Sequence, residues 1–135
     1  MRVILDTGPL VALLNHWDIH HSWALTAAQA LRPPRYTCEA VIAEAHHLLG
    51  HVYQGRRRLY QLVESGRLDF SFSYARDLGE VHALIHTYEE TTMSFADACL
   101  VRMAEMEAGS QIFTIDSHFR VYRQHRTRKL KLLIP

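Results

Sequence analysis

The sequence predicts an α/β domain built on a mainly parallel sheet. Short apolar runs of the kind found in strands alternate along the chain with longer segments of helical periodicity. The first run, Val3-Ile4-Leu5, is apolar at every position, which is typical of a strand buried on both faces of a parallel sheet. Because strands that alternate with helices favour such a sheet, we expect residues 1–135 to form a single α/β domain.

Two helices are expected after the first strand. Thr7-Gly8-Pro9 begins a short helix over residues 7–14, since a proline in the first turn loses nothing by lacking an N–H. A second helix is predicted over about 19–31, because Pro33-Pro34 just after this range would stop it. The next elements are a strand at 35–37, a helix over about 39–49 that Gly50 closes, and a helix over about 52–65 that Gly66 closes.

The second half of the chain continues this alternation. Residues 68–72 alternate apolar and polar side chains, which indicates a strand, and residues 75–88 show the apolar spacing of a helix. A helix over about 95–108 ends at Gly109, and a strand is expected at 111–115. A short helical turn and a last strand at 130–134 follow.

The distribution of charge says more about a partner than the net charge does. The formal net charge is only +1, and 48% apolar with 21% charged residues suits a folded globular protein. Arg56-Arg57-Arg58 form one basic cluster, and residues 120–131 hold six Lys and Arg residues and no acid. Such blocks either track a phosphate backbone or form a solvated face beside an acidic pocket.

The cysteines and the apolar runs bear on the cellular compartment. Cys38 and Cys99 lie outside any CxxC spacing and within apolar helical patterns, so we expect buried free thiols in a reducing compartment. No apolar run approaches the roughly 18 residues that a membrane span needs. The N-terminus also lacks a basic segment followed by an apolar one, and we therefore expect a cytoplasmic protein.

Two acidic residues directly follow predicted strands. Asp6 comes after the first strand, and Asp116 comes after the strand at 111–115. In open α/β sheets, ligands bind beyond the carboxyl ends of the strands. Both carboxylates are therefore expected at the edge where such sites form.

Two further acids lie in apolar helical surroundings. Asp97 is the only charge between Glu90 and Arg102, and a lone carboxylate in a buried helix is costly unless something pairs with it. Glu44 falls at the border of the apolar stripe of its helix, away from the solvated face. With the two strand-end acids, they make a set of four candidate site residues.

Each of the four acids also has a structural interpretation. Asp6 and Asp116 can each cap the helix or helical turn that follows. Ser94 and Asp97 match the S-x-x-[DE] capping box, which satisfies Asp97 without any metal. Glu44 can be an ordinary exposed helix residue.

Four clustered carboxylates predict a metal site. Such groups raise one another's pKa values, and a divalent cation removes the repulsion. A ligand set of carboxylate oxygens, with no Cys and no obligatory His, favours Mg²⁺ or Mn²⁺ over Zn²⁺. Metals of this kind support phosphodiester hydrolysis by activating water and stabilising a leaving oxygen.

The stretches around these acids resemble the PIN-domain nucleases and, among them, the VapC-type ribonuclease toxins of toxin–antitoxin pairs. The matching stretches are Val3-Ile4-Leu5-Asp6-Thr7-Gly8-Pro9-Leu10, Val41-Ile42-Ala43-Glu44, Ser94-Phe95-Ala96-Asp97-Ala98, Phe113-Thr114-Ile115-Asp116-Ser117-His118-Phe119 and the tail Leu132-Leu133-Ile134-Pro135. The resemblance covers essentially the whole chain. It depends on the order and spacing of the set more than on any single motif.

The resemblance implies a PIN-like three-layer α/β/α sandwich and a hydrolase that acts on single-stranded or structured RNA as an endoribonuclease. It implies that the catalytic acids, which also bind Mg²⁺ or Mn²⁺, are Asp6, Glu44, Asp97 and Asp116. An activated water would attack in line and leave a 5′-phosphate and a 3′-hydroxyl.

The resemblance extends to supporting residues and partners. Family members often place hydroxyls where Thr7 and Thr114 stand, to orient a carboxylate or a water, although Thr114 is alternatively a plain strand residue. Many relatives form homodimers and are silenced by a small antitoxin protein. The amphipathic second helix is a candidate surface for either partner, but amphipathicity is the default for a surface helix.

Basic residues and histidines near the motifs raise further possibilities. Arg120 and Arg123 fall near the acidic edge if the turn after Asp116 is helical, and we predict that they contact RNA phosphates. His118 either touches a phosphate or is a surface residue of that turn. Ten histidines invite a zinc hypothesis, but the chain has no HExxH or Cys/His finger spacing, which favours surface or half-buried histidines.

Three rival functions share this fold class. A non-catalytic PIN-fold module that binds RNA or protein is the main alternative, although the presence of all four acids argues against it. A phosphoryl-accepting receiver domain needs paired acids after its first strand, and a haloacid-dehalogenase-type phosphatase needs DxD there. Asp6-Thr7-Gly8 provides neither pattern.

Overall fold

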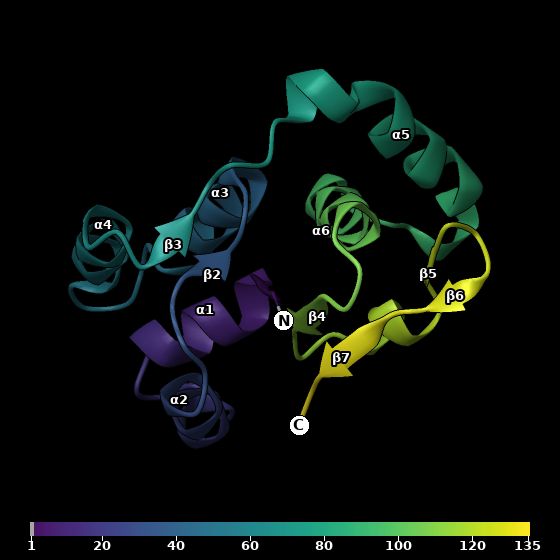
Figure 1. Cartoon of the computed structure of the whole chain (residues 1–135). Helices are drawn as coiled ribbons and strands as arrows, with labels where there is room; N and C mark the ends of the chain where they lie inside the picture. Colours follow the sequence, from purple (N-terminus) through teal and green to yellow (C-terminus); the bar gives the residue numbers. More distant parts are fainter. Residues whose placement is uncertain (1) are drawn as a thin grey trace.

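A five-stranded parallel sheet forms the centre of the computed structural model, which describes residues 2–135 (Figure 1). The strand order is β3-β2-β1-β4-β7, and every neighbouring pair is parallel. The strands are β1 (Val3–Leu5), β2 (Arg35–Tyr36), β3 (Leu68–Asp69), β4 (Gln111–Phe113) and β7 (Lys131–Leu133). The predicted α/β class and parallel sheet are therefore confirmed.

Helices cover both faces of this sheet. They are α1 (Thr7–Leu14), α2 (His21–Gln29), α3 (Glu39–Leu48), α4 (Gly55–Glu64), α5 (Tyr74–Thr87) and α6 (Phe95–Met106), with short 3-10 helices η1 (Glu89–Thr91) and η2 (Ser117–Arg120). Figure 1 shows α1 and α2 on one side of the sheet and α5 and α6 on the other, which makes three layers. Within the described residues, none of the helices combines the length and apolar character that crossing a bilayer requires.

The core lies around the two central strands. All three residues of β1 are buried, as the unbroken apolar run predicted. In α6 the buried side chains occupy nearly every position from Ala96 to Ala104, so this helix is enclosed on most sides. Cys38 and Cys99 are free and buried, as expected, and the Cys99 thiol donates a hydrogen bond that lowers the pKa of Cys38.

The structure contains a hairpin that the sequence rules did not predict. Strands β5 (Arg123–Gln124) and β6 (Arg128–Lys129) form a separate antiparallel pair between η2 and β7. Its loop places His125 and Arg126 at positive φ without the glycine or asparagine that usually marks such a turn. The strands are also too short and too polar to show a periodic pattern.

Several predicted elements are shorter than the sequence suggested. Helix α2 begins at His21 instead of residue 19, because the side chain of Asp18 accepts a hydrogen bond from the His20 N–H in a turn before it. Helix α4 begins at Gly55, after Gln54 in the left-handed region. The order and type of all the predicted helices and sheet strands are nevertheless correct.

Candidate active site

Asp6 is held rigidly at the carboxyl end of β1. Its Oδ1 accepts a hydrogen bond from the Thr7 N–H at 2.7 Å, and its Oδ2 accepts one from the Thr114 hydroxyl at 2.7 Å. The residue is only 6% exposed. Burial raises the pKa of Asp6 to about 7, with smaller contributions from Asp97 and Asp116, although both hydrogen bonds act to lower it.

Thr114 connects two of the predicted acids. Its buried hydroxyl donates to Asp6 and accepts a hydrogen bond from the Asp116 N–H at 2.9 Å. The parallel register of β1 and β4 sets Leu5 beside Phe113, so the residues that follow each strand meet at one edge. Asp6 and Asp116 therefore lie at the carboxyl edge of the sheet, as their positions after the strands predicted. The hydroxyl of Thr114 lies between them.

Asp97 faces the same edge from the first turn of α6. The capping box is present: the Ser94 side chain accepts from the Asp97 N–H at 3.0 Å, and the Asp97 carboxylate accepts from the Ser94 N–H. The hydroxyl of Tyr122 donates to Asp97 Oδ2 at 2.9 Å. Burial raises the pKa of Asp97, and the nearby charge of Asp116 adds to this effect.

Tyr122 is a site residue that the sequence did not reveal. It is fully buried, and it packs edge-on against the rings of Tyr88 and Phe119. Burial and the adjacent carboxylate of Asp97 raise the pKa of the Tyr122 hydroxyl, which therefore stays protonated and donates. A lone tyrosine among arginines carries no motif, so no pattern in the sequence singled it out.

Asp116 is the most open of the acids that follow strands. Its Oδ1 accepts from the His118 N–H at 2.9 Å, which caps η2, and the His118 ring Nδ1 lies 3.0 Å from the same oxygen. Its side chain is 39% exposed. His118 therefore contacts Asp116 of the candidate site. The sequence alone did not decide between a phosphate contact and a surface position.

Glu44 joins the cluster through a hydrogen bond from Thr7. Glu44 lies on α3 and is exposed, and its Oε2 accepts from the Thr7 hydroxyl at 2.9 Å. Thr7 also donates its backbone N–H to Asp6. Thr7 thus forms hydrogen bonds with two of the four predicted acids, and its role in orienting a carboxylate or a water stays a prediction.

The structural and the functional interpretation of these acids are compatible with each other. Asp6, Asp97 and Asp116 each make the capping interaction that offered a simpler explanation. Yet the pKa values of Asp6 and Asp97 also respond to other acids of the set. Three capping carboxylates that repel one another have been gathered at one edge, which capping alone does not require.

The donor set fits a hard divalent cation in its chemistry. All four candidate ligands are carboxylates, which Mg²⁺ and Mn²⁺ prefer, and a cation would remove the repulsion that raises the pKa of Asp6. Among residues 2–135, no three His, Cys, Asp or Glu side chains converge closely enough to hold a metal ion in the arrangement observed. Their oxygens are turned to hydrogen-bond donors of the protein instead.

The two predicted phosphate-binding arginines lie beside this cluster and do not enter it. Arg120 is exposed at the end of η2. Arg123 uses its NH1 group to donate to the backbone oxygens of Arg120, Val121 and Tyr122, at 2.7, 2.9 and 3.0 Å. One edge of the Arg123 guanidinium thus stabilises the end of η2, a role that the sequence did not suggest.

The order of the parallel strands and the three layers are those of a PIN fold. Among solved structures, the chain is similar to VapC20 from Mycobacterium tuberculosis, a toxin that cleaves the sarcin–ricin loop. The TM-score is 0.76 at 18% sequence identity, over 85% of this chain and 90% of that one. No family model matches the sequence, and no curated protein matches it either.

Proposed function

We propose that the chain is a Mg²⁺- or Mn²⁺-dependent endoribonuclease that hydrolyses phosphodiester bonds of RNA. The observation that carries the proposal is the grouping of Asp6, Asp97 and Asp116, whose charges raise the pKa values of Asp6 and Asp97. A fold shared with an RNA-cleaving toxin supports RNA as the substrate. Glu44 is exposed and the side chain of Asp116 is 39% exposed, so a large substrate can reach these two acids.

The four acids would hold the metal, which when bound would supply charge neutralisation at the phosphate and a more acidic water. The chain's own residues do the positioning. Thr114 fixes the carboxylate of Asp6, Tyr122 fixes that of Asp97, and Thr7 ties Glu44 to the end of β1. Carboxylates that are already oriented lose less entropy when they bind a ligand.

A role as the toxin of a type II toxin–antitoxin pair is the biological part of the proposal. It is supported by the likeness to VapC20 and by an exposed apolar surface. Trp17 and Ile19, in the loop between α1 and α2, are each 92% exposed, and large exposed apolar side chains mark protein interfaces. A small antitoxin and a second copy of the chain are the partners we propose, within the cytoplasm.

The alternative is a non-catalytic PIN-fold module that binds RNA or protein. One observation favours it: no three potential ligands converge among the described residues. The two functions differ in what a metal does, because a nuclease needs it for turnover and a binding module does not.

Cleavage of labelled RNA by the purified protein tests the proposal. We expect cleavage with Mg²⁺ or Mn²⁺, none with EDTA, and a loss of at least a hundredfold in Asp6→Asn and Asp97→Asn, since catalytic charges commonly contribute that much. Asp69→Asn, which changes an acid on β3 outside the cluster, is the matched control and should cleave normally. RNA binding without cleavage under every metal condition would support the binding module instead.

A further inference from the structure

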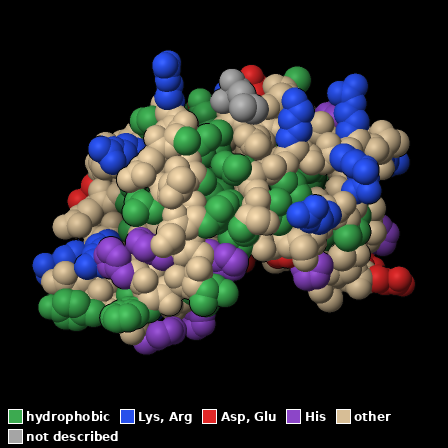
Figure 2. Space-filling view, turned by 90° about the horizontal axis from the view of Figure 1, so that it is seen from below, with side chains coloured by type: hydrophobic (Ala, Val, Ile, Leu, Met, Phe, Trp, Pro, Cys, Tyr) green, Lys and Arg blue, Asp and Glu red, His purple; other side chains and the backbone are tan. Residues whose placement is uncertain are grey.

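A pocket lined by cations lies between η2 and the C-terminal strands. Its volume is about 310 Å³, and its walls are Arg120, Arg123, Lys129, Leu130, Leu132 and Ile134. No acidic residue lines it. Figure 2 shows several Lys and Arg side chains on the half of the molecule that carries the C-terminal strands, and others at the opposite end.

The cations of this pocket are close together and lack acidic partners. Arg123 and Lys129 are directly opposite each other in the β5–β6 pair, a position in which like charges destabilise a sheet. Within residues 2–135, no carboxylate lies within ion-pair distance of either residue or of Arg120. A bound anion would relieve this repulsion.

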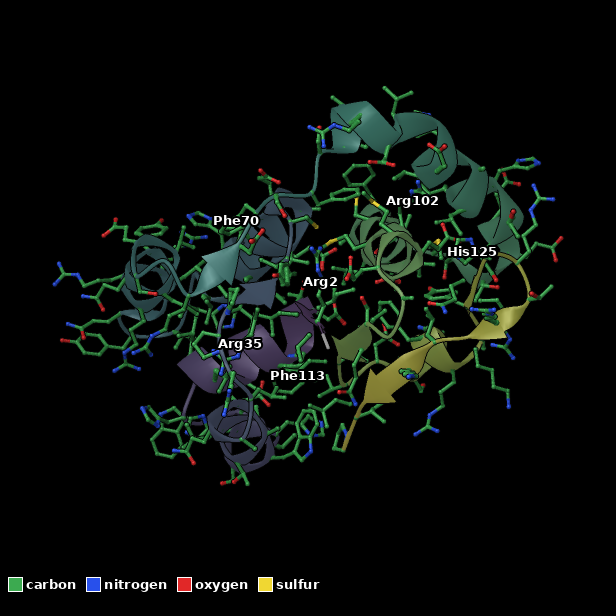
Figure 3. The ribbon with its side chains drawn as sticks, in the orientation of Figure 1. Arg2, Arg35, Phe70, Arg102, Phe113 and His125 are labelled. Atoms are coloured by element: carbon green, nitrogen blue, oxygen red, sulfur yellow. The ribbon has the colours of Figure 1, made fainter. Side chains whose placement is uncertain are left out.

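The hairpin that carries these cations is fixed to the body of the protein. The Arg123 N–H donates to the Tyr88 hydroxyl at 2.9 Å, and the His125 N–H donates to Glu105 of α6 at 2.7 Å. Arg102 forms ion pairs with Glu105 and with Asp77 of α5. Figure 3 shows Arg102 and His125 on the side of α6 that faces α5 and the hairpin. The cations are therefore presented by a rigid support, which lowers the entropy lost on binding.

The rest of the pocket is apolar. Leu130 is buried, and Leu132 lies in β7 opposite Ile112 of the sheet, so this wall is part of the fold. A cationic edge beside an aliphatic wall matches the two parts of a nucleotide, since the cations can bind the charged phosphate and the wall can cover an apolar face of the base. A free phosphate would use only one of these parts.

The pocket is one short helix away from the acids. Asp116 caps the beginning of η2 and Arg120 ends it, and a four-residue 3-10 helix spans roughly 8 Å. Tyr122, which donates to Asp97, is followed directly by Arg123 of the pocket. A strand of RNA held at the acids would therefore pass the pocket.

We propose that this pocket binds a nucleotide of the RNA that flanks the bond to be cleaved, through its phosphate at Arg120, Arg123 and Lys129 and its base on the leucine wall. The inference rests on the proposed nuclease function for the identity of its ligand. The pocket itself can be tested without catalysis.

Adenosine 5′-monophosphate in EDTA is the probe for the pocket, followed by ¹H–¹⁵N NMR. We expect saturable shifts at the amides of η2, β6 and β7, with weaker binding of adenosine and of inorganic phosphate. Lys129→Gln and Arg120→Gln should each weaken binding roughly tenfold, because each removes a charged contact. Arg57→Gln on α4 is the control of equal charge change. Arg123 is left intact because its guanidinium also supports the backbone.

A short single-stranded RNA in EDTA gives a second measurement. The slope of log affinity against log salt should fall by about 0.7 for each pocket cation removed. If RNA is cleaved but the pocket variants bind the nucleotide and the RNA like the wild type, the pocket is refuted and the nuclease stands. If no RNA is cleaved but the nucleotide binds at Lys129, the nuclease proposal fails and the pocket stands. Shifts spread over other basic surfaces would also refute the pocket.

Discussion

The hydroxyl of Thr114 donates to the carboxylate of Asp6 across 2.7 Å, although the two residues are 108 positions apart in the chain. The same oxygen accepts the N–H of Asp116. One buried side chain thus fixes the relative position of two acids that repel each other. It makes Thr114 the most informative residue to change outside the acids themselves.

Replacing Thr114 by valine should impair cleavage with a moderate loss of stability. The change keeps the shape but leaves the Asp116 N–H and the Asp6 oxygen without their partner, which costs about 1–3 kcal/mol of unfolding free energy. We expect kcat/KM for RNA to fall by roughly tenfold or more, since orientation of a ligand is lost. Thr114→Ser keeps the hydroxyl and should restore most activity. Equal activity in both variants would contradict the role of the hydroxyl.

The stability of the metal-free protein should decrease as pH rises toward 7. The pKa of Asp6 is about 7 in the folded protein and 3.8 is its ordinary value, so between these pH values the folded chain holds a proton that the unfolded chain has lost. The free energy of unfolding therefore falls with rising pH over that window and is level above it. Urea denaturation in EDTA across the window measures this contribution.

Asp6→Asn is the variant that isolates this effect. An amide stays neutral, so the variant should gain stability over the wild type near about pH 8 and little near about pH 4. Saturating Mg²⁺ should stabilise the wild type more than the variant, since the cation favours the ionised carboxylate. A variant that is equally destabilised at every pH would show that the carboxyl is not under electrostatic strain.

Tyr122→Phe should move the pH profile of cleavage. The Tyr122 hydroxyl lowers the pKa of Asp97, so its removal raises that pKa further and shifts the acidic limb of kcat/KM to higher pH. The aromatic packing against Tyr88 and Phe119 is retained, and the thermal midpoint should change little. Loss of activity with an unmoved profile would indicate a purely structural role.

Gly8→Ala should disturb the site through Ile115. A Cβ at residue 8 would lie against the Ile115 side chain, with Cδ1 at 2.8 Å. Ile115 directly precedes Asp116, so the crowding is relieved by moving that segment, at a cost of about 1–3 kcal/mol. Ile115→Ala makes room, and the double variant should be more stable than the sum of the two single changes predicts. Strict additivity of the unfolding free energies would show that no crowding occurs.

Hydrophobic patterning was sufficient to place the helices and the parallel sheet. The unbroken apolar run at β1 and the largely apolar segment of α6 are found as a strand and a helix because burial of those side chains determines both elements. The positions of Asp6 and Asp116 followed from the topology alone, since parallel strands end at one edge. The sequence pattern and the structure agree for those elements whose position is determined by burial of their apolar side chains.

The features of the structure that the sequence did not predict depend on single long-range contacts. Tyr122 reaches Asp97 from 25 residues away, and nothing local distinguishes it from other aromatic residues. The β5–β6 pair is anchored by hydrogen bonds from Arg123 to Tyr88 and from His125 to Glu105, which a linear reading does not show. For the same reason the sequence predicts a phosphate contact for Arg123 but does not show that its guanidinium also donates to the backbone.

The distance in sequence between Asp6 and Thr114 has a consequence for synthesis of the protein. A chain emerging from the ribosome carries Asp6 almost at once, but Thr114 follows only 108 residues later. Contacts between such distant segments also form late in folding, because closing a long loop costs entropy. Unfinished chains that end before Thr114 therefore lack the hydrogen bond that orients Asp6, and under the proposed function they would not yet cleave RNA.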